Sequence, residues 1–297
     1  MTNSYIKSPL NYTGGKYKIL KYIIPNFPNK ISTFVDLFAG GLNVGINVNA
    51  DMIYANDHID YLIELYCYFR TTPIESLISE IKDTIRRYDL SQSNAEGYNA
   101  LRTEYNRTKK IMDLFVLTCY SFNHQIRFNN QHLFNTPFGK ERSSYNNKIE
   151  ANLVRFCKAL KEKKIILTNH DFSDFDFTTL KRGDLVYCDP PYLISVGSYN
   201  DGKRGFKDWS TKEEQELLHL LDSLNRKGVC FALSNVLQHK GLKNELLIKW
   251  SENYFTTSIE KSYSNSSYQL KDRNTKTVEV LITNYEVKQP CLITPEI

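Results

Sequence analysis

The sequence lacks long apolar runs, paired cysteines and stretches rich in glycine or proline. None of its apolar runs approaches the roughly 18 residues that a membrane-spanning helix needs. Its start has neither the basic region nor the apolar stretch of a secretory signal. The six cysteines stand far apart without any Cys-x-x-Cys pair, which excludes a zinc ribbon and a secreted disulfide framework. We therefore expect a cytoplasmic protein with reduced thiols, no bound metal and no membrane segment.

The sequence also has only a small net positive charge. The 38 basic residues outnumber the 33 acidic residues by 5, and the pI of about 8.7 permits a polyanionic partner without requiring one. Aromatic residues are abundant instead: 20 Tyr and 16 Phe suit stacking on bases as well as packing in a core. A chain of 297 residues, 41% of them hydrophobic, is long enough for about two globular domains.

Apolar runs of strand length alternate with helical periodicity along most of the chain. Strands are expected at 33–38, 52–56, 165–168, 185–188, 229–233, 255–260 and 277–283, and helices at 42–48, 148–160 and 211–226. This alternation predicts an α/β fold with a mainly parallel sheet that helices cover on both faces.

Between residues 61 and 145 the pattern changes to consecutive helices. They are expected at 60–69, 73–88, 95–107 and 109–122, and the polar, turn-rich stretch at 124–139 favours a β-hairpin. The predicted organisation is a sheet domain made of residues 1–60 and 146–297, with a mainly helical insertion at 61–145.

The tetrapeptide Asp189-Pro190-Pro191-Tyr192 directly follows the strand expected at 185–188. In open α/β sheets, ligands bind beyond the carboxyl ends of the strands, where this segment falls. Because two prolines fix the backbone and have no N–H, the Pro190 carbonyl can point into a pocket beside the Asp189 carboxylate. Two acceptors beside a flat ring suit the exocyclic amine of a planar base, whose lone pair they would turn toward an electrophile. The alternative is a rigid turn with Tyr192 packed on the sheet edge.

Two glycine turns and an aspartate add weaker signals. The Gly40-Gly41 turn after the first strand does not fit G-x-G-x-x-G, which disfavours a dinucleotide site. Asp57, after the second strand, is placed to accept hydrogen bonds from ribose hydroxyls. Tyr12 and Lys16 flank another glycine pair and suit a sulfonium amino acid with its carboxylate. Each feature alone is equally well explained by an ordinary turn or helix start.

Residues 123–142 mix arginine, asparagine and aromatic side chains. Arginine pairs bidentately with guanine and asparagine with adenine, while apolar rings can wedge into a base stack. In isolation, a solvated hairpin with structural aromatic residues is the better explanation.

Taken together, these segments resemble the Dam-type, alpha-class (D12) DNA adenine N6-methyltransferases, in particular those of T-even bacteriophages. The likeness rests on the order of residues 12–16, 34–41, the helical insertion and residues 189–192, and it extends to about residue 285. It implies a Rossmann-like S-adenosylmethionine-dependent methyltransferase sheet and double-stranded DNA as partner. It also implies direct methyl transfer to N6 of a flipped adenine, with the insertion as the target-recognition domain.

The resemblance implies roles for individual residues as well. Asp189 and the Pro190 carbonyl would hold the amino group, and Tyr192 would stack on the flipped base. The implied cofactor-binding residues are Tyr12, Lys16, Phe38, Ala39, Gly40, Gly41, Asp57, Asp171, Phe172 and Asp189. The implied DNA-binding residues are Asn123, Gln125, Arg127, Asn129, Phe134, Pro137, Lys140 and Arg142.

Two questions stay open at this point. Asn123 and Gln125 depart from the phage enzymes, so GATC is one option for the recognition sequence. Alternative functions are an amino methyltransferase acting on cytosine N4, RNA or a protein glutamine, and an inactive relative that binds DNA or senses the cofactor. Asp189 favours adenine, because relatives with those other substrates usually carry serine or asparagine at this position.

Overall fold

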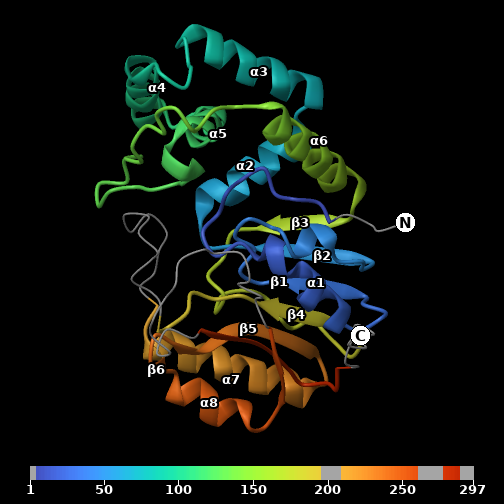
Figure 1. The fold of residues 1–297 in the computed structure, drawn as a ribbon. Coiled ribbons are helices and arrows are strands. Elements are labelled where there is room, and N and C mark those ends of the chain that lie inside the picture. Colours follow the sequence, from blue (N-terminus) through green and yellow to red (C-terminus); the bar gives the residue numbers. More distant parts are fainter. Residues whose placement is uncertain (1–4, 195–208, 260–276, 288–297) are drawn as a thin grey trace, which may run out of the picture.

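A mostly parallel sheet forms the centre of the protein, in a computed structural model that describes residues 5–194, 209–259 and 277–287 (Figure 1). The strands are β1 (Thr33–Asp36), β2 (Met52–Asn56), β3 (Ile165–Thr168), β4 (Leu185–Cys188), β5 (Cys230–His239), β6 (Leu242–Lys243), β7 (Phe255–Ser258) and β8 (Val278–Thr283). Their order is β3-β2-β1-β4-β5-β8-β7, with β6 paired to β5 off this path. The first five strands in this order are parallel, and β8 runs antiparallel to both of its neighbours.

Helices cover the sheet and extend beyond its β3 edge (Figure 1). The α-helices are α1 (Leu20–Ile23), α2 (Asp60–Thr71), α3 (Ile74–Arg87), α4 (Ala95–Thr108), α5 (Ile111–Tyr120), α6 (Asn147–Glu162), α7 (Thr211–Lys227) and α8 (Glu245–Ser251). Single 3-10 turns are η1 (Lys16–Ile19), η2 (Ile24–Asn26), η3 (Gly45–Asn47) and η4 (Phe122–His124). Helix α7 begins at a capping box formed by Ser210 and Glu213, and it ends at Gly228, whose φ of 77° suits a residue without Cβ.

The chain reverses its direction of travel across the sheet between β1 and β4. From β1 it moves outward through β2 to β3, and it then returns to β4 and continues to β5 on the other side. The connections after β1 and β4 therefore diverge and leave a crevice at the carboxyl ends of these strands, where open α/β sheets bind ligands. Residues 37–41 follow β1 and residues 189–192 follow β4, so two of the segments singled out in the sequence flank this crevice.

Both faces of the sheet are buried, as the sequence predicts. Successive residues of β1 and β4 alternate between two hydrophobic clusters: Phe34 and Tyr187 belong to one, and Val35 and Val186 to the other. The first cluster lies under α2 and α6, and the second under α7 and α8. Burial on both faces explains why these strands consist of nearly continuous apolar runs instead of alternating with polar residues.

Most of the expected elements are present, with several local differences. The helix predicted at 42–48 shrinks to η3, because Leu42 has a left-handed φ of 53° and the Asp36 carboxylate accepts the Gly45 N–H at 2.8 Å. Strand β5 continues well past residue 233, and sequence analysis missed α8 beside it. The predicted hairpin at 124–139 has no regular strands, since it pairs only through two single bridges, Ser121 with Phe138 and Phe128 with Phe134.

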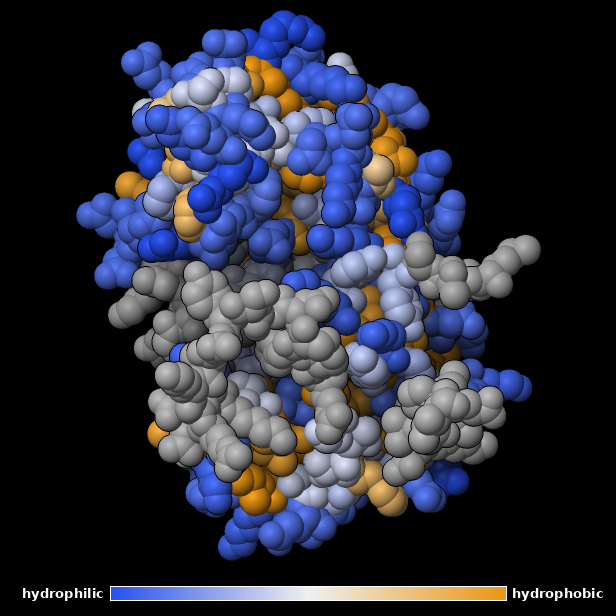
Figure 2. All heavy atoms as spheres, viewed as in Figure 1, coloured by the Kyte–Doolittle hydropathy of each residue, from blue (hydrophilic) through white to orange (hydrophobic). Residues whose placement is uncertain are grey.

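The helical insertion shares its core with the sheet over the residues that the structure describes. The cluster that contains Phe34 of β1 continues through Phe115 of α5 to Phe128 and Phe134. Helix α3 buries Leu77 and presents polar residues outward, and Figure 2 shows a largely hydrophilic surface over α3 and α4 at the top of this view.

Phe134 was predicted to contact DNA, and the structure places it in this core instead. Its side chain is only 1% exposed, and its ring packs edge-on against Tyr105 and Phe128 at centroid distances of 6.1 and 5.8 Å. The Asn106 side chain also pairs with both backbone polar groups of Phe134. The aromatic ring therefore anchors the loop to α4 and cannot reach a base.

We expect Phe134→Ala to lower the free energy of unfolding by about 3 to 5 kcal/mol, because it removes a buried ring and leaves a cavity. Denaturant unfolding measures this change. Phe122→Ala is the matched control, since Phe122 is 40% exposed in the same loop and should shift stability by less than about 1 kcal/mol. Equal effects of the two substitutions would contradict the core assignment.

Candidate active site

The loops after β1, β2 and β4 enclose a cleft with about 640 Å³ of empty space, open to solvent. Predicted cofactor-binding or catalytic residues on its wall are Tyr12, Lys16, Phe38, Ala39, Gly40, Gly41, Asp57, Asp189 and Pro190. Residues far apart in the sequence thus meet in one cavity because the carboxyl ends of parallel strands share one edge of the sheet.

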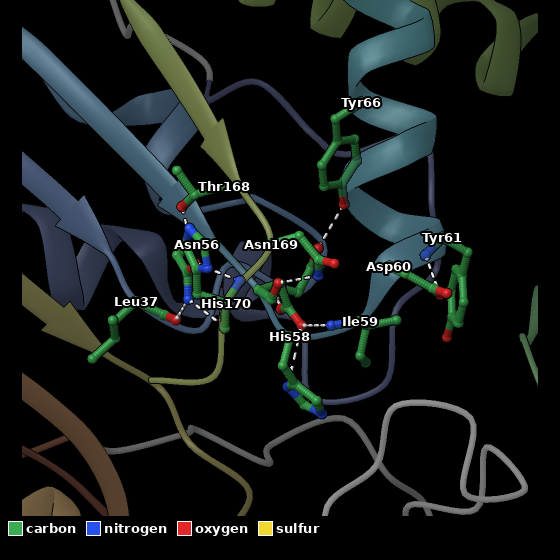
Figure 3. Close-up of polar contacts among 12 residues, drawn as sticks. Leu37, Asn56, His58, Ile59, Asp60, Tyr61, Tyr66, Thr168, Asn169 and His170 are labelled. Carbon is green, nitrogen blue, oxygen red and sulfur yellow. Dashed lines mark hydrogen bonds and ion pairs between the residues drawn. The ribbon is translucent and has the colours of Figure 1, made fainter. Parts of the chain in front are cut away.

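The glycine turn after β1 forms the floor of this cleft and depends on close packing. Gly40 has a left-handed φ of 46°, and a Cβ at this position would lie 3.0 Å from the Tyr12 ring. The Tyr66 hydroxyl donates to the Gly40 carbonyl at 2.6 Å and ties the turn to α2 (Figure 3). A side chain at position 40 would push Tyr12 away, so glycine is required here for both conformation and space.

Asp57 supports the same turn from the end of β2. Its Oδ2 accepts the Gly40 N–H at 2.7 Å and its Oδ1 accepts the Ile59 N–H at 3.0 Å. His58 Nδ1 lies 3.6 Å from Oδ1, as Figure 3 shows. Burial raises the pKa of Asp57, and His58 and the backbone N–H groups oppose this rise. The carboxylate therefore shapes the cleft wall as well as facing it.

Asn56 joins the ends of three strands beside Asp57. Its Nδ2 donates to the carbonyls of Leu37 and His170, and its Oδ1 accepts from Thr168 (Figure 3). These bonds fix the segment after β3, including Asp171 and Phe172, against the glycine turn.

Asp189 lies at the centre of a charged cluster. Lys16 Nζ is 2.7 Å from Asp189 Oδ1, and their side chains are only 6% and 17% exposed. The Tyr192 hydroxyl donates to the same oxygen at 3.2 Å and lies 3.4 Å from Glu279 Oε1. Burial raises the pKa of Asp189, whereas Lys16 lowers it. Among the described residues, these contacts fall on Oδ1, so Oδ2 is available to an amino hydrogen.

Two further residues, Tyr192 and Glu279, pack against this cluster. The Tyr192 ring is 9% exposed and has Lys16 Nζ above it, 5.0 Å from the centroid, rather than open cleft. Glu279, in β8, is buried beside it and carries no motif, so sequence analysis missed this third carboxylate.

A second cavity, with about 360 Å³ of empty space, adjoins the first and has aromatic walls. The rings of Phe38, Phe172 and Trp209 line it and pack against one another, with centroid separations of 5.5 to 5.7 Å. Asp171 and Pro191 also line it. Phe38 and Pro191 belong to both cavities, so the two spaces adjoin each other. Sequence analysis predicted Asp171 and Phe172 but not Trp209.

The predicted DNA-binding residues other than Phe134 lie on or near the surface of the loop at 121–142. Exposed side chains are Asn123, Arg127, Pro137, Lys140 and Arg142, and Gln125 is half-buried. The half-buried Asn129 caps its own turn, because its Oδ1 accepts the N–H groups of Gln131 and Leu133. Asn11 Nδ2 donates to the Asn123 carbonyl at 2.8 Å, which connects this loop to the segment before Tyr12.

Within 5–194, 209–259 and 277–287, no group of His, Cys, Asp or Glu side chains is arranged to hold a metal ion. No helix in these ranges is long and apolar enough to cross a membrane.

The sheet order, the glycine turn and the Asp-Pro-Pro-Tyr segment at the reversal point of the sheet are consistent with an α/β methyltransferase fold. Residues 12–276 match the D12 class of N6 adenine-specific DNA methyltransferases, and the chain belongs to this family.

Named relatives are modification enzymes. The chain is 55% identical over 284 residues to "Type II methyltransferase M.FokI" of Planomicrobium okeanokoites, covering 96% of this chain and 44% of that protein. It is 47% identical over 289 residues to "Modification methylase StsI" of Streptococcus sanguinis, covering 97% and 44%. The chain thus spans less than half the length of both relatives.

The similarity to cellular Dam is weaker. "DNA adenine methylase" of Escherichia coli (strain K12) is 25% identical over 234 residues, covering 76% of this chain and 79% of that enzyme. The expected particular likeness to phage Dam enzymes is therefore replaced by a likeness to type II modification methylases.

Asp36 allows a test of the electrostatics of the cleft. Burial raises its pKa to about 7, with Asp189 and Asp57 adding to the rise, whereas an unfolded chain gives a value near 4 (about 3.9). The folded state therefore binds the proton of the Asp36 carboxyl group more tightly than the unfolded chain does. The stability that this bound proton contributes is lost as the pH rises toward about 7.

We expect Asp36→Asn, which keeps an acceptor for the Gly45 N–H, to remove this loss. As the pH rises from about 4 to 7, the free energy of unfolding of the wild type should fall relative to that of the variant. Above about pH 7, the difference between the two proteins should stay constant. Denaturant unfolding of both proteins across this range measures the difference. Curves that stay parallel throughout would show that Asp36 is already ionised at low pH.

Proposed function

We propose that this chain transfers a methyl group from S-adenosylmethionine to N6 of adenine in duplex DNA, as the modification methylase of a type II restriction-modification system. The observation that carries this proposal is the placement of Asp189 and Pro190 on the wall of the larger cleft, opposite the glycine turn. Family membership and the printed names of its relatives support it.

The two adjoining cavities suit the parts of S-adenosylmethionine. Tyr12, Lys16 and residues 39–41 would hold the methionine part, and Asp57 the ribose hydroxyls. The aromatic cavity at Phe38 and Phe172 has the flat apolar walls that an adenine ring needs. The buried carboxyls of Asp36, Asp57 and Asp189, whose pKa values are all raised, suit a ligand that carries a sulfonium and an ammonium group. When bound, this cofactor supplies the methyl group.

Asp189 and Pro190 would act on the target amine through hydrogen bonds. Lys16 and Tyr192 occupy Asp189 Oδ1 and keep the carboxylate oriented. Oδ2 and the Pro190 carbonyl would then accept the two amino hydrogens and turn the nitrogen lone pair toward the methyl group, an electrostatic effect of a preorganised site. Stacking of the flipped base on Tyr192 stays a prediction, since Lys16 lies over that ring in this structure.

The loop at 121–142 would read the DNA sequence. Arg127 is exposed there, and a guanidinium fork matches the O6 and N7 acceptors of guanine. Phe128 and Phe134 anchor the loop to the core, and the bond from Asn11 to Asn123 joins it to the cleft wall. We propose residues 61–145 as the recognition region of a catalytic domain made of 1–60 and 146–297. GATC stays one option for the recognition sequence.

Asp189→Ala tests the chemistry. We expect the rate of methyl transfer to DNA to fall by about 10² to 10³, because a transition-state contact is lost. Transfer of a labelled methyl group to DNA measures the rate, and calorimetric titration and unfolding measure cofactor binding and stability alongside. The control is Asp51→Ala, an exposed aspartate before β2 at the opposite end of the sheet. A variant that turned over at the wild-type rate would remove Asp189 from the mechanism.

Arg127→Ala tests the reading of sequence. We expect preference to relax at one base pair, since a bidentate arginine contact is worth about 1 to 3 kcal/mol of discrimination. Mapping of methylated adenines in DNA from cells that express each variant gives the recognition sequence directly. Lys140→Ala, an exposed cation of the same loop, is the comparison and should weaken all sites alike. A uniform loss in Arg127→Ala would assign Arg127 to the DNA backbone instead.

A further inference from the structure

A buried carboxylate holds Trp209, one of the aromatic residues that line the second cavity. Glu214 of α7 is 0% exposed, and its two oxygens accept hydrogen bonds from three side chains. Trp209 Nε1 donates to Oε2 at 2.7 Å. Asn244 Nδ2 and Asn235 Nδ2 donate to Oε1 at 3.0 and 3.2 Å. The donors come from three separate segments: the residue before the α7 cap, strand β5 and the N-cap of α8.

The position of Glu214 in its helix explains why it meets Trp209. Ser210 caps α7, so Trp209 occupies the position before the cap and Glu214 is the fourth residue of the helix. In many helices these two positions carry apolar side chains that contact each other and fix the angle at which the chain enters the helix. Here a charge-assisted hydrogen bond from an indole to a carboxylate takes the place of that apolar contact.

A structural role alone would be served more cheaply by an apolar residue. A buried carboxylate is costly to desolvate, and well-packed apolar groups often replace such networks without loss of stability. What the carboxylate adds is direction: it holds the edge of the Trp209 ring in one orientation. That ring is one wall of the cavity, at centroid distances of 5.7 Å from Phe38 and 5.6 Å from Phe172.

We propose that Glu214 is a positioning residue for cofactor binding, which acts through Trp209 without touching the ligand. This inference rests on the proposed function in one respect, namely that the aromatic cavity takes the adenine ring of S-adenosylmethionine. With the Glu214 bond in place, the indole plane is set before the ligand arrives, so less conformational entropy is lost on binding. Without this bond, the indole can adopt more than one orientation. The Trp209 ring then lines the cavity correctly for only part of the time.

Trp209 provides a direct optical readout. The chain has two tryptophans, Trp209 and Trp250, and Trp250 lies in α8 away from the cavity with its Nε1 bonded to Asp222. In a Trp250→Phe background, Trp209 alone emits, and titration with S-adenosylmethionine should change its emission along a saturation curve.

Glu214→Gln is the first test in that background. The glutamine amide has one oxygen that accepts and one NH₂ group that donates, whereas both oxygens of Glu214 accept. Its NH₂ group must therefore face either the Trp209 N–H or the two asparagine N–H groups, and the hydrogen bond on that side is lost. We expect the Kd for S-adenosylmethionine to rise by about twofold to tenfold, the size expected when one side chain has to be ordered on binding instead of beforehand. The KM for the cofactor should rise with it, whereas kcat at saturating cofactor should stay within about twofold, because Asp189 and Pro190 are untouched.

Two further variants separate positioning from stability. Asn244→Ala removes a donor to Oε1 and the cap of α8, so it should lower stability but leave the Kd near the wild-type value. Trp209→Phe keeps a ring but has no N–H, and in a wild-type Trp250 background it should weaken cofactor binding when measured by calorimetry. Combined with Glu214→Gln it should add little, as expected for two residues that act through one bond. Trp209→Phe also keeps the test decisive if Glu214→Gln does not fold.

The outcomes are distinguishable. Saturable binding to the wild type, weakened in Glu214→Gln and Trp209→Phe but not in Asn244→Ala, supports the inference. Wild-type affinity in both Glu214→Gln and Trp209→Phe overturns it and leaves the proposed function intact. Equal weakening in all three variants also overturns it, because general loosening of the fold then explains the effect. If the wild type shows no saturable binding at all, the proposed function fails and this inference with it.

Discussion

The parallel pairing of β1 with β2 on one side and β4 on the other is the constraint on which the rest of this structure depends. It brings the carboxyl ends of the central strands to one edge, and the reversal of strand order between β1 and β4 keeps their connecting loops from closing over that edge. The glycine turn, Asp57 and Asp189 owe their proximity to this arrangement, and the bond from the Gly40 N–H to Asp57 then fixes the turn against the end of β2.

Three buried carboxyl groups lie at this edge of the sheet, and they outnumber the basic side chains beside them. Lys16 is ion-paired with Asp189 there, while burial raises the pKa values of Asp36, Asp57 and Asp189. Backbone N–H groups supply part of the compensation, at Gly45 for Asp36 and at Gly40 and Ile59 for Asp57. A cleft of this kind favours a cationic ligand, and each carboxyl also has a local structural partner.

The parts of the site that sequence could predict are those that local patterns encode. Asp57 and Asp189 follow apolar strands directly, so their place at the sheet edge can be deduced from the strand pattern alone. Strand patterns could not reveal Trp209, Glu214 and Glu279. Trp209 and Glu214 lie at the start of α7 and Glu279 lies in β8, and none of them belongs to a sequence motif. Phe134 was misplaced for a related reason: its partner Tyr105 lies in another helix, and a ring within a polar loop gives no sign of which way it points.

The loop at 121–142 separates its exposed side chains from the aromatic residues that support it. Phe128 and Phe134 face inward and join the core, whereas Asn123, Arg127 and Lys140 face outward from the same loop. Exposed positions away from special contacts usually change stability by no more than about 0.5 kcal/mol. Substitutions at exposed positions such as Arg127 and Lys140 should therefore leave the fold of the loop largely unchanged. If this loop reads DNA, as proposed above, its target sequence can therefore change one residue at a time without passing through unstable intermediates.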